Sequence, residues 1–209
     1  GRTARMKVVL ASGNPGKLAE LGDLLGGAGL ELVPQGALGI ADPVEDGHTF
    51  VENALIKARN ASRLSGLPAL ADDSGLIVDA LGGAPGLISA HYAGVHGDAA
   101  GNIAKLLGEL RGVPTQRRSA RFYCCLVLLR HAEDPQPLIA EGEWPGRVLD
   151  APRGDGGFGY DPVFFDPATN LGAGEMPPEQ KNPISHRGRA LAALKARLAE
   201  WIARGAAVG

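Results

Sequence analysis

Cysteine is scarce in this chain of 209 residues, which contains two, Cys124 and Cys125. They are neighbours in an apolar run that is typical of a strand, where successive side chains point to opposite faces. A disulfide between them is therefore not expected. The two thiols are expected to be core residues, and a chain without disulfides is typical of a reducing compartment, so we expect a cytoplasmic location.

Long apolar runs are also lacking. The longest stretch surrounds residues 126–129 and is far short of the roughly 20 residues that a membrane-spanning helix needs. The first residues are polar and basic, but the apolar run after them is too short for a secretory signal. No membrane partner is expected, and residues 1–5 are expected to be a disordered or extraneous start ahead of Met6.

Neither sign of charge dominates the sequence. The chain has 21 Lys and Arg residues against 23 Asp and Glu residues, which gives a formal net charge of −2. There is no overall field to attract nucleic acid, so any anion-binding site must be local. Hydrophobic residues make up 44% of the chain, enough for a substantial core. We therefore expect one globular domain over residues 6–209.

Glycine is abundant, with 31 residues, and its clusters separate segments that have the periodicity of strands and helices. Strands are predicted over residues 7–11, 30–33, 69–71, 76–80, 121–129, 138–144 and 162–165. Helices are predicted over four segments: one that ends at Gly26 and Gly27, one from a Thr49–Glu52 capping box to Gly66, one between Asp98 and Gly112, and a last one through residues 191–201. Residues 72–75 then fall in a loop or at a strand end. The order of elements indicates a mixed α/β fold.

The loop between the first strand and the first helix is a candidate phosphate site. It offers backbone N–H groups, the positive end of a helix and a lysine. It is not a P-loop, because that pattern needs a glycine at position 11 and a hydroxyl at position 18. The alternative is a plain turn with a solvated lysine. The six residues are Ser12, Gly13, Asn14, Pro15, Gly16 and Lys17.

Two adjacent carboxylates and a hydroxyl follow a predicted strand, at Asp72, Asp73 and Ser74. Such a group can hold Mg²⁺ and orient a water molecule, although adjacent acids are often only solvated. Glu45 and Asp46 precede the second helix and are weaker candidates for outer metal ligands. Their alternative role is to place negative charge at a helix N-terminus.

Residues 154–159 match the G-x-G-x-x-G pattern of dinucleotide sites, but the proline at position 162 prevents the helix that such a site requires. What remains is a loop that presents Phe158, Tyr160 and Asp161 to a planar base, or an ordinary surface loop. A second cluster of polar residues lies before the last helix and could donate hydrogen bonds to a base carbonyl or a phosphate. The alternative is a basic surface turn. The residues are Lys181, Ser185, His186, Arg187 and Arg189.

Six blocks in this order along the chain resemble the inosine triphosphate pyrophosphatase family, whose members remove deaminated purine triphosphates. The blocks are SGNPGK (12–17), TFVENA (49–54), ADDSGL (71–76), GGAPG (82–86), FGYDP (158–162) and SHRG (185–188). The likeness covers nearly all of residues 6–201. It implies an α/β homodimer with a long central mixed β-sheet flanked by helices, in which two lobes enclose a nucleotide cleft.

The resemblance also implies roles for these residues. Residues 12–17 and Lys57 would bind the triphosphate. Glu45 and Asp73 would hold Mg²⁺, with Asp72 as a further candidate ligand. Asp73 would also be the general base for the attacking water, beside Ser74. A last group would sandwich and read the base: Phe158, Gly159, Tyr160, Asp161, Lys181, His186 and Arg187.

The implied reaction is hydrolysis of ITP, dITP or XTP between the α and β phosphates, which yields the monophosphate and pyrophosphate. Donors that face O6 of the base would favour hypoxanthine and xanthine over adenine. Two alternatives remain open: a pyrophosphatase for modified pyrimidine triphosphates, and a nucleotide sensor that binds without hydrolysis. Nucleic acid is not expected as a partner.

Overall fold

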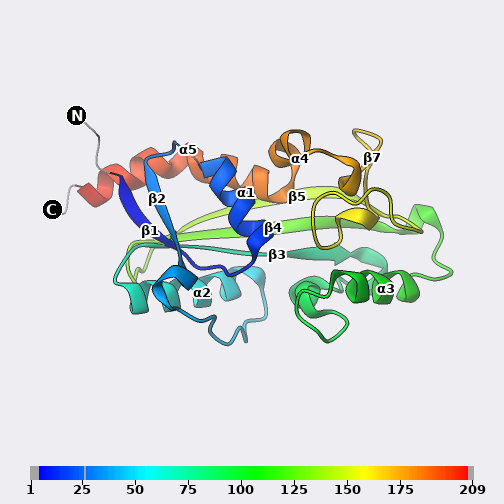
Figure 1. The fold of residues 1–209 in the computed structure, drawn as a ribbon, viewed down its shortest axis with the longest axis horizontal. Coiled ribbons are helices and arrows are strands. Elements are labelled where there is room, and N and C mark those ends of the chain that lie inside the picture. The colour runs from blue at the N-terminus through cyan, green and yellow to red at the C-terminus, as the bar shows by residue number, and fades with distance from the viewer. Residues whose placement is uncertain (1–4, 26, 207–209) are drawn as a thin grey trace. The chain divides into compact units, whose positions relative to one another are not determined.

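A computed structural model describes residues 5–25 and 27–206 of the chain (Figure 1). The strands are β1 (Met6–Leu10), β2 (Leu30–Pro34), β3 (Ala69–Val78), β4 (Ser119–Leu129), β5 (Leu138–Val148), β6 (Phe164–Asp166) and β7 (Leu171–Gly172). The α-helices are α1 (Pro15–Leu25), α2 (Phe50–Ser65), α3 (Ala99–Glu109), α4 (Pro178–Ile184) and α5 (His186–Ala206). Short 3₁₀ helices cover Gln35–Leu38, Asp79–Leu81, Gly86–His91, Thr115–Arg117, Asp161–Val163 and Ala173–Glu175.

The seven strands form one sheet in the order β2-β1-β3-β4-β5-β6-β7. Strand β1 is parallel to β2 and β3, whereas β6 is antiparallel to β5 and β7. The predicted α/β fold with a mixed sheet is therefore confirmed. Residues 1–5 were predicted to be a disordered or extraneous start. Residues 1–4 lie outside the described residues, and Arg5 is exposed. The first helix was predicted to end at Gly26 and Gly27. Gly26 lies outside the described residues, and Gly27 has a φ of +83°.

The chain divides into two compact units. The first consists of residues 1–73, 124–142 and 187–209, and the second of residues 74–123 and 143–186. In neither unit does a helix of the described residues have the length and apolar character needed to cross a bilayer.

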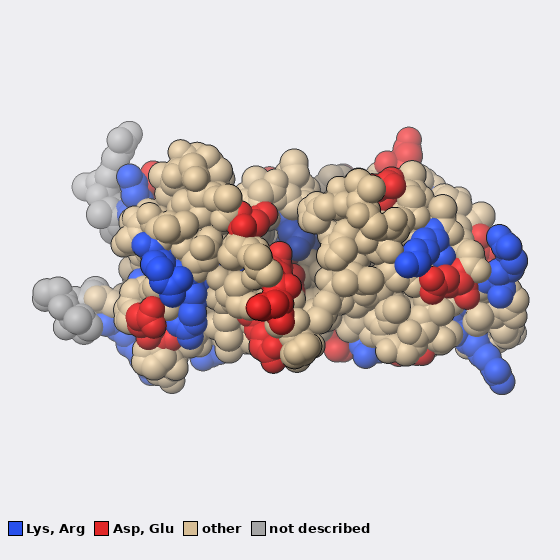
Figure 2. All heavy atoms as spheres, turned by 90° about the horizontal axis from the view of Figure 1, so that it is seen from below, with Lys and Arg blue, Asp and Glu red and all other residues tan. Residues whose placement is uncertain are grey.

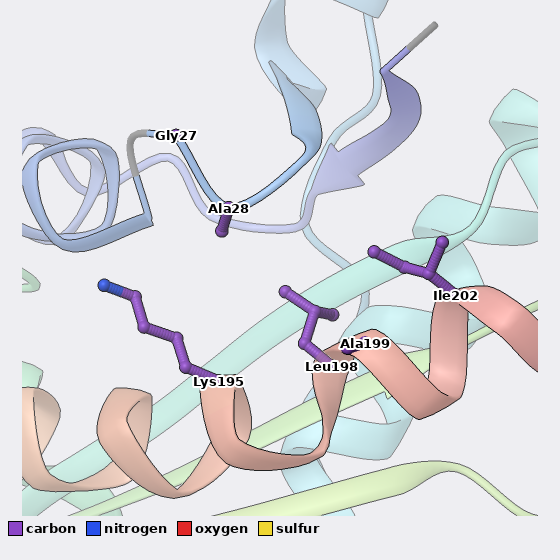
Figure 3. A pocket seen from close by; sticks show the side chains of 6 residues that line it. All are labelled: Gly27, Ala28, Lys195, Leu198, Ala199 and Ile202. Carbon is purple, nitrogen blue, oxygen red and sulfur yellow. The ribbon is translucent and has the colours of Figure 1, made fainter. Parts of the chain in front are cut away.

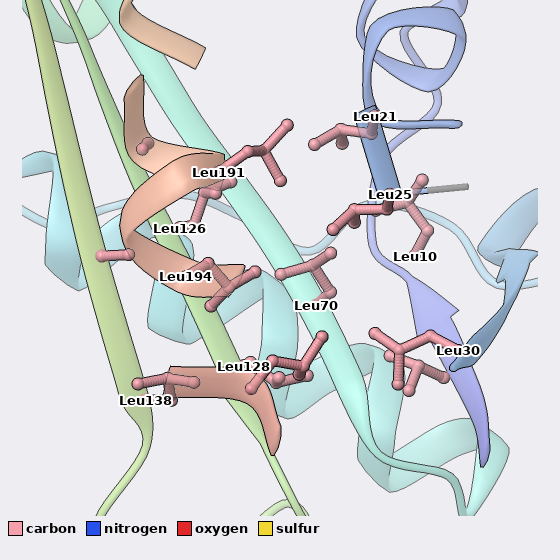
Figure 4. Packing of buried hydrophobic residues seen from close by; sticks show 14 of the residues in the cluster. Leu10, Leu21, Leu25, Leu30, Leu70, Leu126, Leu128, Leu138, Leu191 and Leu194 are labelled. Atoms are coloured by element: carbon pink, nitrogen blue, oxygen red, sulfur yellow. The ribbon is translucent and has the colours of Figure 1, made fainter. Parts of the chain in front are cut away.

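In the first unit, a cluster of buried apolar side chains fills the space between the strands and two helices, α1 and α5 (Figures 1 and 4). Every second residue of a strand joins it, because successive side chains point to opposite faces. Each fully buried leucine contributes about 2 kcal/mol of hydrophobic free energy, so the cluster fixes both helices on this face. Figure 4 labels Leu10, Leu21, Leu25, Leu30, Leu70, Leu126, Leu128, Leu138, Leu191 and Leu194.

Helix α2 lies on the other side of β1 and β2 (Figure 1). It turns three fully buried alanines inward, Ala54, Ala58 and Ala61, and such small side chains let the helix approach the sheet closely. The predicted cap of this helix is confirmed, because the Thr49 hydroxyl accepts a hydrogen bond from the Glu52 backbone N–H. The position of every residue on α2 relative to the strands of this unit is therefore closely fixed.

The second unit has a core of its own, which is rich in aromatic rings. Phe164 packs against Phe122 and Trp144, with ring centroids 4.4 and 5.0 Å apart. Leu106 of helix α3 and Leu110, directly after the helix, also belong to this core. The predicted N-cap of this helix is confirmed, because the Asp98 carboxylate accepts a hydrogen bond from the backbone of α3.

The prediction of a loop at residues 72–75 is wrong, because β3 runs without a break from Ala69 to Val78. Adjacent acids disfavour a strand unless their charges are compensated, and here Asp72 and Asp73 both contact cationic side chains. Helix α4 was not predicted, since it is short and contains Pro178 and Pro183. Strand β6 begins at Phe164, two residues after the predicted start.

Candidate functional site

The two carboxylates of β3 have separate surroundings. Asp72 contacts Lys17 of α1 and Arg187 of α5, whereas Asp73 contacts Lys57 of α2. This division follows from the alternation of side chains along a strand, since α1 and α5 lie on one side of β1 and β2 and α2 lies on the other (Figure 1). The two acids therefore do not converge on one point.

Asp72 is the centre of a buried ionic group in the first unit. Its side chain is fully buried, and Oδ1 lies 2.8 Å from Lys17 Nζ. Oδ2 accepts hydrogen bonds from Arg187 Nε and from the Cys124 thiol, both at 3.0 Å. Burial by itself raises the pKa of Asp72, but the charges of Arg187 and Lys17 outweigh it and hold the pKa well below its ordinary value. Arg187 also contacts Glu20, so the group contains two cations and two anions.

Lys57 holds the second carboxylate in place. Its ammonium has three acceptors, namely the Asp72 backbone oxygen at 2.7 Å, Asp73 Oδ1 at 3.1 Å and Glu45 Oε1 at 3.3 Å. Burial would lower the pKa of Lys57, but the carboxylates around it raise it. Two of the three N–H donors of the ammonium form hydrogen bonds, and through the ion pair with Glu45 Lys57 joins Asp73 to Glu45.

Asp73 keeps one carboxylate oxygen for other partners. Its side chain is 13% exposed, and burial raises its pKa above the ordinary value although Lys57 and Lys17 act in the opposite direction. Within the described part of the chain, the contacts of its carboxylate are made by Oδ1, and no hydrogen-bond or ion-pair partner meets Oδ2. A carboxyl group with this pKa and an open oxygen suits the binding of a water molecule or a cation.

The carboxylates of Glu45 and Asp73 fit a magnesium ion. Both contact the same ammonium group, so their oxygens lie close together. Over residues 5–25 and 27–206, no group of three or more His, Cys, Asp or Glu side chains is arranged to hold a metal. Mg²⁺ does not need such a cage, because proteins commonly bind it through one or two carboxylates together with phosphate oxygens. Asp72 is enclosed by other partners and lies outside this pair.

The segment that carries Glu45 is tied to α2. The Gly47 backbone N–H donates to the Asn53 side chain at 2.8 Å, and a Cβ at Gly47 would collide with Asn53 and Glu52. Only glycine permits this close approach. The exposed acids of residues 42–52 are Asp42, Glu45, Asp46 and Glu52. Figure 2 shows that acidic side chains gather near the middle of one face of the protein.

The loop before α1 brings Lys17 beside Asp72. Asn14 Oδ1 accepts hydrogen bonds from the backbone N–H groups of Gly16 and Lys17, at 2.9 and 3.2 Å, and the Asn14 N–H donates to Ser12 Oγ. A phosphate at these amides would have to displace the Asn14 side chain. Among the described residues, the ammonium of Lys17 contacts Asp72 alone, so two of its N–H donors remain for a ligand.

In the second unit, three residues that were predicted to read a base come together. Lys181 Nζ lies 2.6 Å from Asp161 Oδ2 and 4.8 Å from the centroid of the Phe158 ring. The Phe158 backbone N–H donates to the same carboxylate at 3.0 Å. Gly157 has a φ of +70°, and a Cβ there would collide with Asp161. The glycine-rich loop thus forms a compact group around one buried ion pair.

Other predicted base-binding residues are held elsewhere. The Tyr160 ring is buried in the core of the second unit, and its hydroxyl donates to the Ser89 backbone oxygen at 2.7 Å. Burial and Tyr92 raise the pKa of Tyr160, so this donor keeps its proton. His186 stacks on Phe122, with centroids 4.8 Å apart and an interplanar angle of 16°. Phe158, which is half-buried, is the more accessible aromatic ring of the loop.

The alternative of a basic surface turn before the last helix is wrong. Lys181, Ser185, His186 and Arg187 are buried, and only Arg189 of this cluster is exposed. The cluster also separates by unit, because residues 181–186 belong to the second unit and residues from 187 onward to the first. The guanidinium of Arg187 pairs with two carboxylates of the first unit, those of Glu20 and Asp72.

Two members of the ionic group were missed from the sequence. Glu20 lies three residues after Lys17, a spacing that places both side chains on one face of a helix, and this signal was available. Cys124 was expected to be a plain core residue. Nothing in its neighbourhood along the chain distinguishes it from Cys125, and both are buried cysteines outside any disulfide.

The first unit also has a hollow that contains none of the predicted site residues. Lys195, Leu198 and Ile202 project from α5 toward Ala28 in the turn before β2 (Figure 3). Its remaining lining comes from Gly27 and Ala199. With one charged side chain, it has little of the chemistry that a phosphate or metal ligand requires.

Comparisons with known proteins agree with this architecture. The model of the Ham1 family matches residues 8–197. A dITP/XTP pyrophosphatase of Xanthomonas oryzae pv. oryzae is 64% identical over 191 residues, which cover 91% of this chain and 96% of that protein. A dITP/XTP pyrophosphatase of Methylococcus capsulatus is 59% identical over 194 residues, or 93% and 96% of the two chains. The solved structure of a HAM1 protein from Coxiella burnetii has a TM-score of 0.87 and 47% identity, and covers 93% of this chain and 99% of its own.

Proposed function

The chain belongs to the Ham1 family, and from this premise we propose that it hydrolyses deaminated purine nucleoside triphosphates. The substrates would be ITP, dITP and XTP, and the products the nucleoside monophosphate and pyrophosphate. The names of the relatives support this substrate class. The chemistry of the first unit supports a hydrolase, because it joins a carboxyl group suited to a base, a pair of carboxylates suited to Mg²⁺ and a lysine with donors to spare.

The observation that carries the proposal is the contrast between Asp72 and Asp73. The pKa of Asp72 is held well below its ordinary value by Arg187 and Lys17 in spite of burial, and the pKa of Asp73 is raised by burial. Neighbouring carboxyl groups whose pKa values are driven apart commonly divide the work of acid-base catalysis. Asp72 would stay ionised as a counter-ion, and Asp73 would exchange a proton.

In the proposed reaction, Asp73 accepts a proton from the water molecule that attacks the α-phosphorus. A bond forms from the water oxygen to phosphorus, the bond to the bridging α–β oxygen breaks, and pyrophosphate leaves. A raised pKa makes this carboxylate a stronger base than an ordinary aspartate.

Glu45 and Asp73 would hold Mg²⁺ together with phosphate oxygens. When bound, the ion neutralises charge on the triphosphate. Lys17 would donate its remaining N–H groups to the phosphates, while Lys57 would keep the two carboxylates in position. The backbone N–H groups of the loop before α1 would complete the phosphate contacts by exchanging the Asn14 side chain for a phosphate.

Base selectivity is proposed for the group around Asp161. The ammonium of Lys181, oriented by Asp161, would donate to O6 of hypoxanthine or xanthine, and the Phe158 ring would stack on the base. Adenine carries an amino group at that position, so two donors would oppose each other without an acceptor. The predicted contact from His186 stays a prediction.

The test is to incubate the purified protein with Mg²⁺ and ITP, dITP, XTP, GTP or ATP, and to measure pyrophosphate and orthophosphate separately. The proposal expects pyrophosphate from the first three substrates and little from GTP and ATP. Pyrophosphate mainly from 5-methyl-UTP or another modified pyrimidine triphosphate would instead favour a different pyrophosphatase. Tight binding of ITP without any product would indicate a nucleotide sensor.

We propose from the family resemblance that the protein is a cytoplasmic homodimer. Light scattering coupled to size-exclusion chromatography measures the mass directly. A particle of about twice the chain mass of 21.5 kDa is expected, and a mass equal to one chain would contradict the homodimer.

A further inference from the structure

Lys17 owes its position to Asp72, and Asp72 in turn depends on its own partners. The Asp72 side chain has no exposed surface, so its charge is stable only while hydrogen bonds and cations replace water. Lys17 reaches Oδ1 at 2.8 Å, and Oδ2 is held by two donors on other elements. A carboxylate is a rigid plane, so groups that fix Oδ2 also fix the direction in which Oδ1 points.

One of these two donors has no part in the chemistry proposed above. Cys124 Sγ lies 3.0 Å from Asp72 Oδ2, and the thiol is fully buried on β4. Burial, followed by the charge of Asp72, raises the pKa of Cys124 well above its ordinary value, so the thiol retains the proton that it donates. Cys124 packs on the face of α1 and α5, as a member of the leucine cluster shown in part in Figure 4.

We propose that Cys124 is a positioning residue of the triphosphate site, which orients the Asp72 carboxylate so that Oδ1 holds the Lys17 ammonium beside the loop of residues 12–16. Arg187 supplies the charge that stabilises Asp72. The thiol donates to the same oxygen as Arg187 Nε but from another element, β4, and so adds a second constraint on the direction of the carboxylate. This inference rests on the proposed function, because it assigns to Lys17 the binding of the substrate's phosphates.

Cys125 provides a matched control, because it is the next residue of the same strand and is equally buried. It is not a member of the leucine cluster that contains Cys124, since neighbouring side chains of a strand point to opposite faces. Replacing either thiol with alanine removes one sulfur atom from the core. The replacement of Cys124 also removes the thiol that donates to Asp72 Oδ2.

The experiment compares Cys124→Ala, Cys124→Ser and Cys125→Ala with the unchanged protein. Calorimetry measures the Kd for inorganic tripolyphosphate in EDTA, steady-state kinetics with XTP and Mg²⁺ give KM and kcat, and thermal unfolding gives Tm. Cys124→Ala is expected to raise Kd and KM about tenfold, the change that corresponds to about 1.4 kcal/mol for a lost hydrogen bond to a charged group. The change in kcat of Cys124→Ala should be smaller than its change in KM. Cys124→Ser should recover most of the affinity for tripolyphosphate. Cys125→Ala should keep Kd and KM within about twofold of the values of the unchanged protein.

Equal Kd and KM values for Cys124→Ala and Cys125→Ala would overturn the inference, even if both variants lose stability. Failure of Cys124→Ser to recover affinity would do the same. If the alanine variants do not fold, Cys124→Val and Cys125→Val allow the same comparison with less loss of volume.

Tripolyphosphate binding separates this inference from the proposed function. A protein that binds tripolyphosphate in a manner dependent on Cys124, but does not release pyrophosphate from XTP, would refute the function and support the positioning role. A protein that does not bind tripolyphosphate would refute the positioning role, whatever it hydrolyses.

Discussion

At the scale of single residues, burial decides which charged groups act on a ligand and which act on other residues. Lys57 donates hydrogen bonds to two oxygens and forms an ion pair with Glu45, whereas Lys17 has one acceptor among the described residues and keeps two donors. Both lysines lie beside aspartates of β3, yet their chemistry differs. The first holds carboxylates in place, and the second keeps donors for the phosphates of the proposed substrate.

Replacing Asp73 with asparagine should lower kcat for XTP by a factor on the order of 10²–10⁴, because the amide cannot accept the proton of the attacking water. The fold should survive, since the amide oxygen can still accept a hydrogen bond from Lys57. Steady-state pyrophosphate release together with Tm measures both effects. Asp79→Asn is the control, because Asp79 is an exposed acid that contacts Ser119 and Arg121 and should leave kcat unchanged. Full activity of Asp73→Asn would exclude Asp73 as the base.

Replacing Arg187 with methionine should destabilise the protein at pH 7 by about 3–5 kcal/mol, because it leaves the Asp72 and Glu20 carboxylates without their shared cation. The folded-state pKa of Asp72 lies well below the ordinary value of 3.8, so its ion pairs stabilise the fold fully above about pH 4. Their contribution is lost as the pH falls toward the folded-state pKa. The difference between the two proteins should therefore shrink below about pH 4.

Urea unfolding at several pH values between 7 and 3 measures this difference. Arg204→Met is the control on the same helix, since Arg204 pairs with Glu200 at the surface and should change stability by less than about 0.5 kcal/mol. Equal stabilities of Arg187→Met and Arg204→Met would show that the buried group does not carry the stability assigned to it.

At the scale of elements, the sequence predicts those parts whose signals are local. The limits of α2 follow from the cap at Thr49 and the left-handed glycine at Gly66, both of which are readable within a few residues. The continuity of β3 is not readable in this way. It depends on Lys17 and Arg187, which lie far from Asp72 along the chain and reach it only after folding.

Replacing Thr49 with alanine should lower the free energy of unfolding by about 1 kcal/mol, because the helix loses the acceptor for the Glu52 N–H. Thr49→Ser keeps a hydroxyl and should remain within a few tenths of a kcal/mol of the unchanged protein. Since the cap lies two turns from Lys57, kcat should stay near its original value. Denaturant unfolding and XTP kinetics measure the two effects, and a stability of Thr49→Ala equal to that of Thr49→Ser would rule out the cap as a stabilising contact.

At the scale of the whole molecule, the order of motifs was more informative than any motif alone. The family resemblance predicts that residues 12–17, Asp73 and Lys57 serve one site, and in the structure Lys17 pairs with Asp72 while Lys57 pairs with Asp73 and Glu45. The involvement of Cys124 and the engagement of Arg187 could not be predicted. Each contact requires a particular face of β4 or α5 to lie against Asp72. The hydrophobic pattern of a segment does not predict which charged side chain of another segment it will face.

Removal of the metal should abolish hydrolysis and leave the fold intact. Glu45 and Asp73 are held by Lys57 without a metal, and none of the described elements depends on a metal cage. Pyrophosphate release in excess EDTA should fall to background and return when Mg²⁺ is restored, while Tm stays the same. A large fall of Tm in EDTA would show a structural metal that this account does not contain.

The central claim is that water attacks the α-phosphorus, and isotope labelling tests it most directly. The protein is incubated with XTP and Mg²⁺ in water enriched in ¹⁸O, and both products are analysed by mass spectrometry. The account predicts one ¹⁸O atom in the monophosphate and unlabelled pyrophosphate. Label in the pyrophosphate, or release of labelled orthophosphate, would mean that a different phosphorus is attacked and would contradict the mechanism.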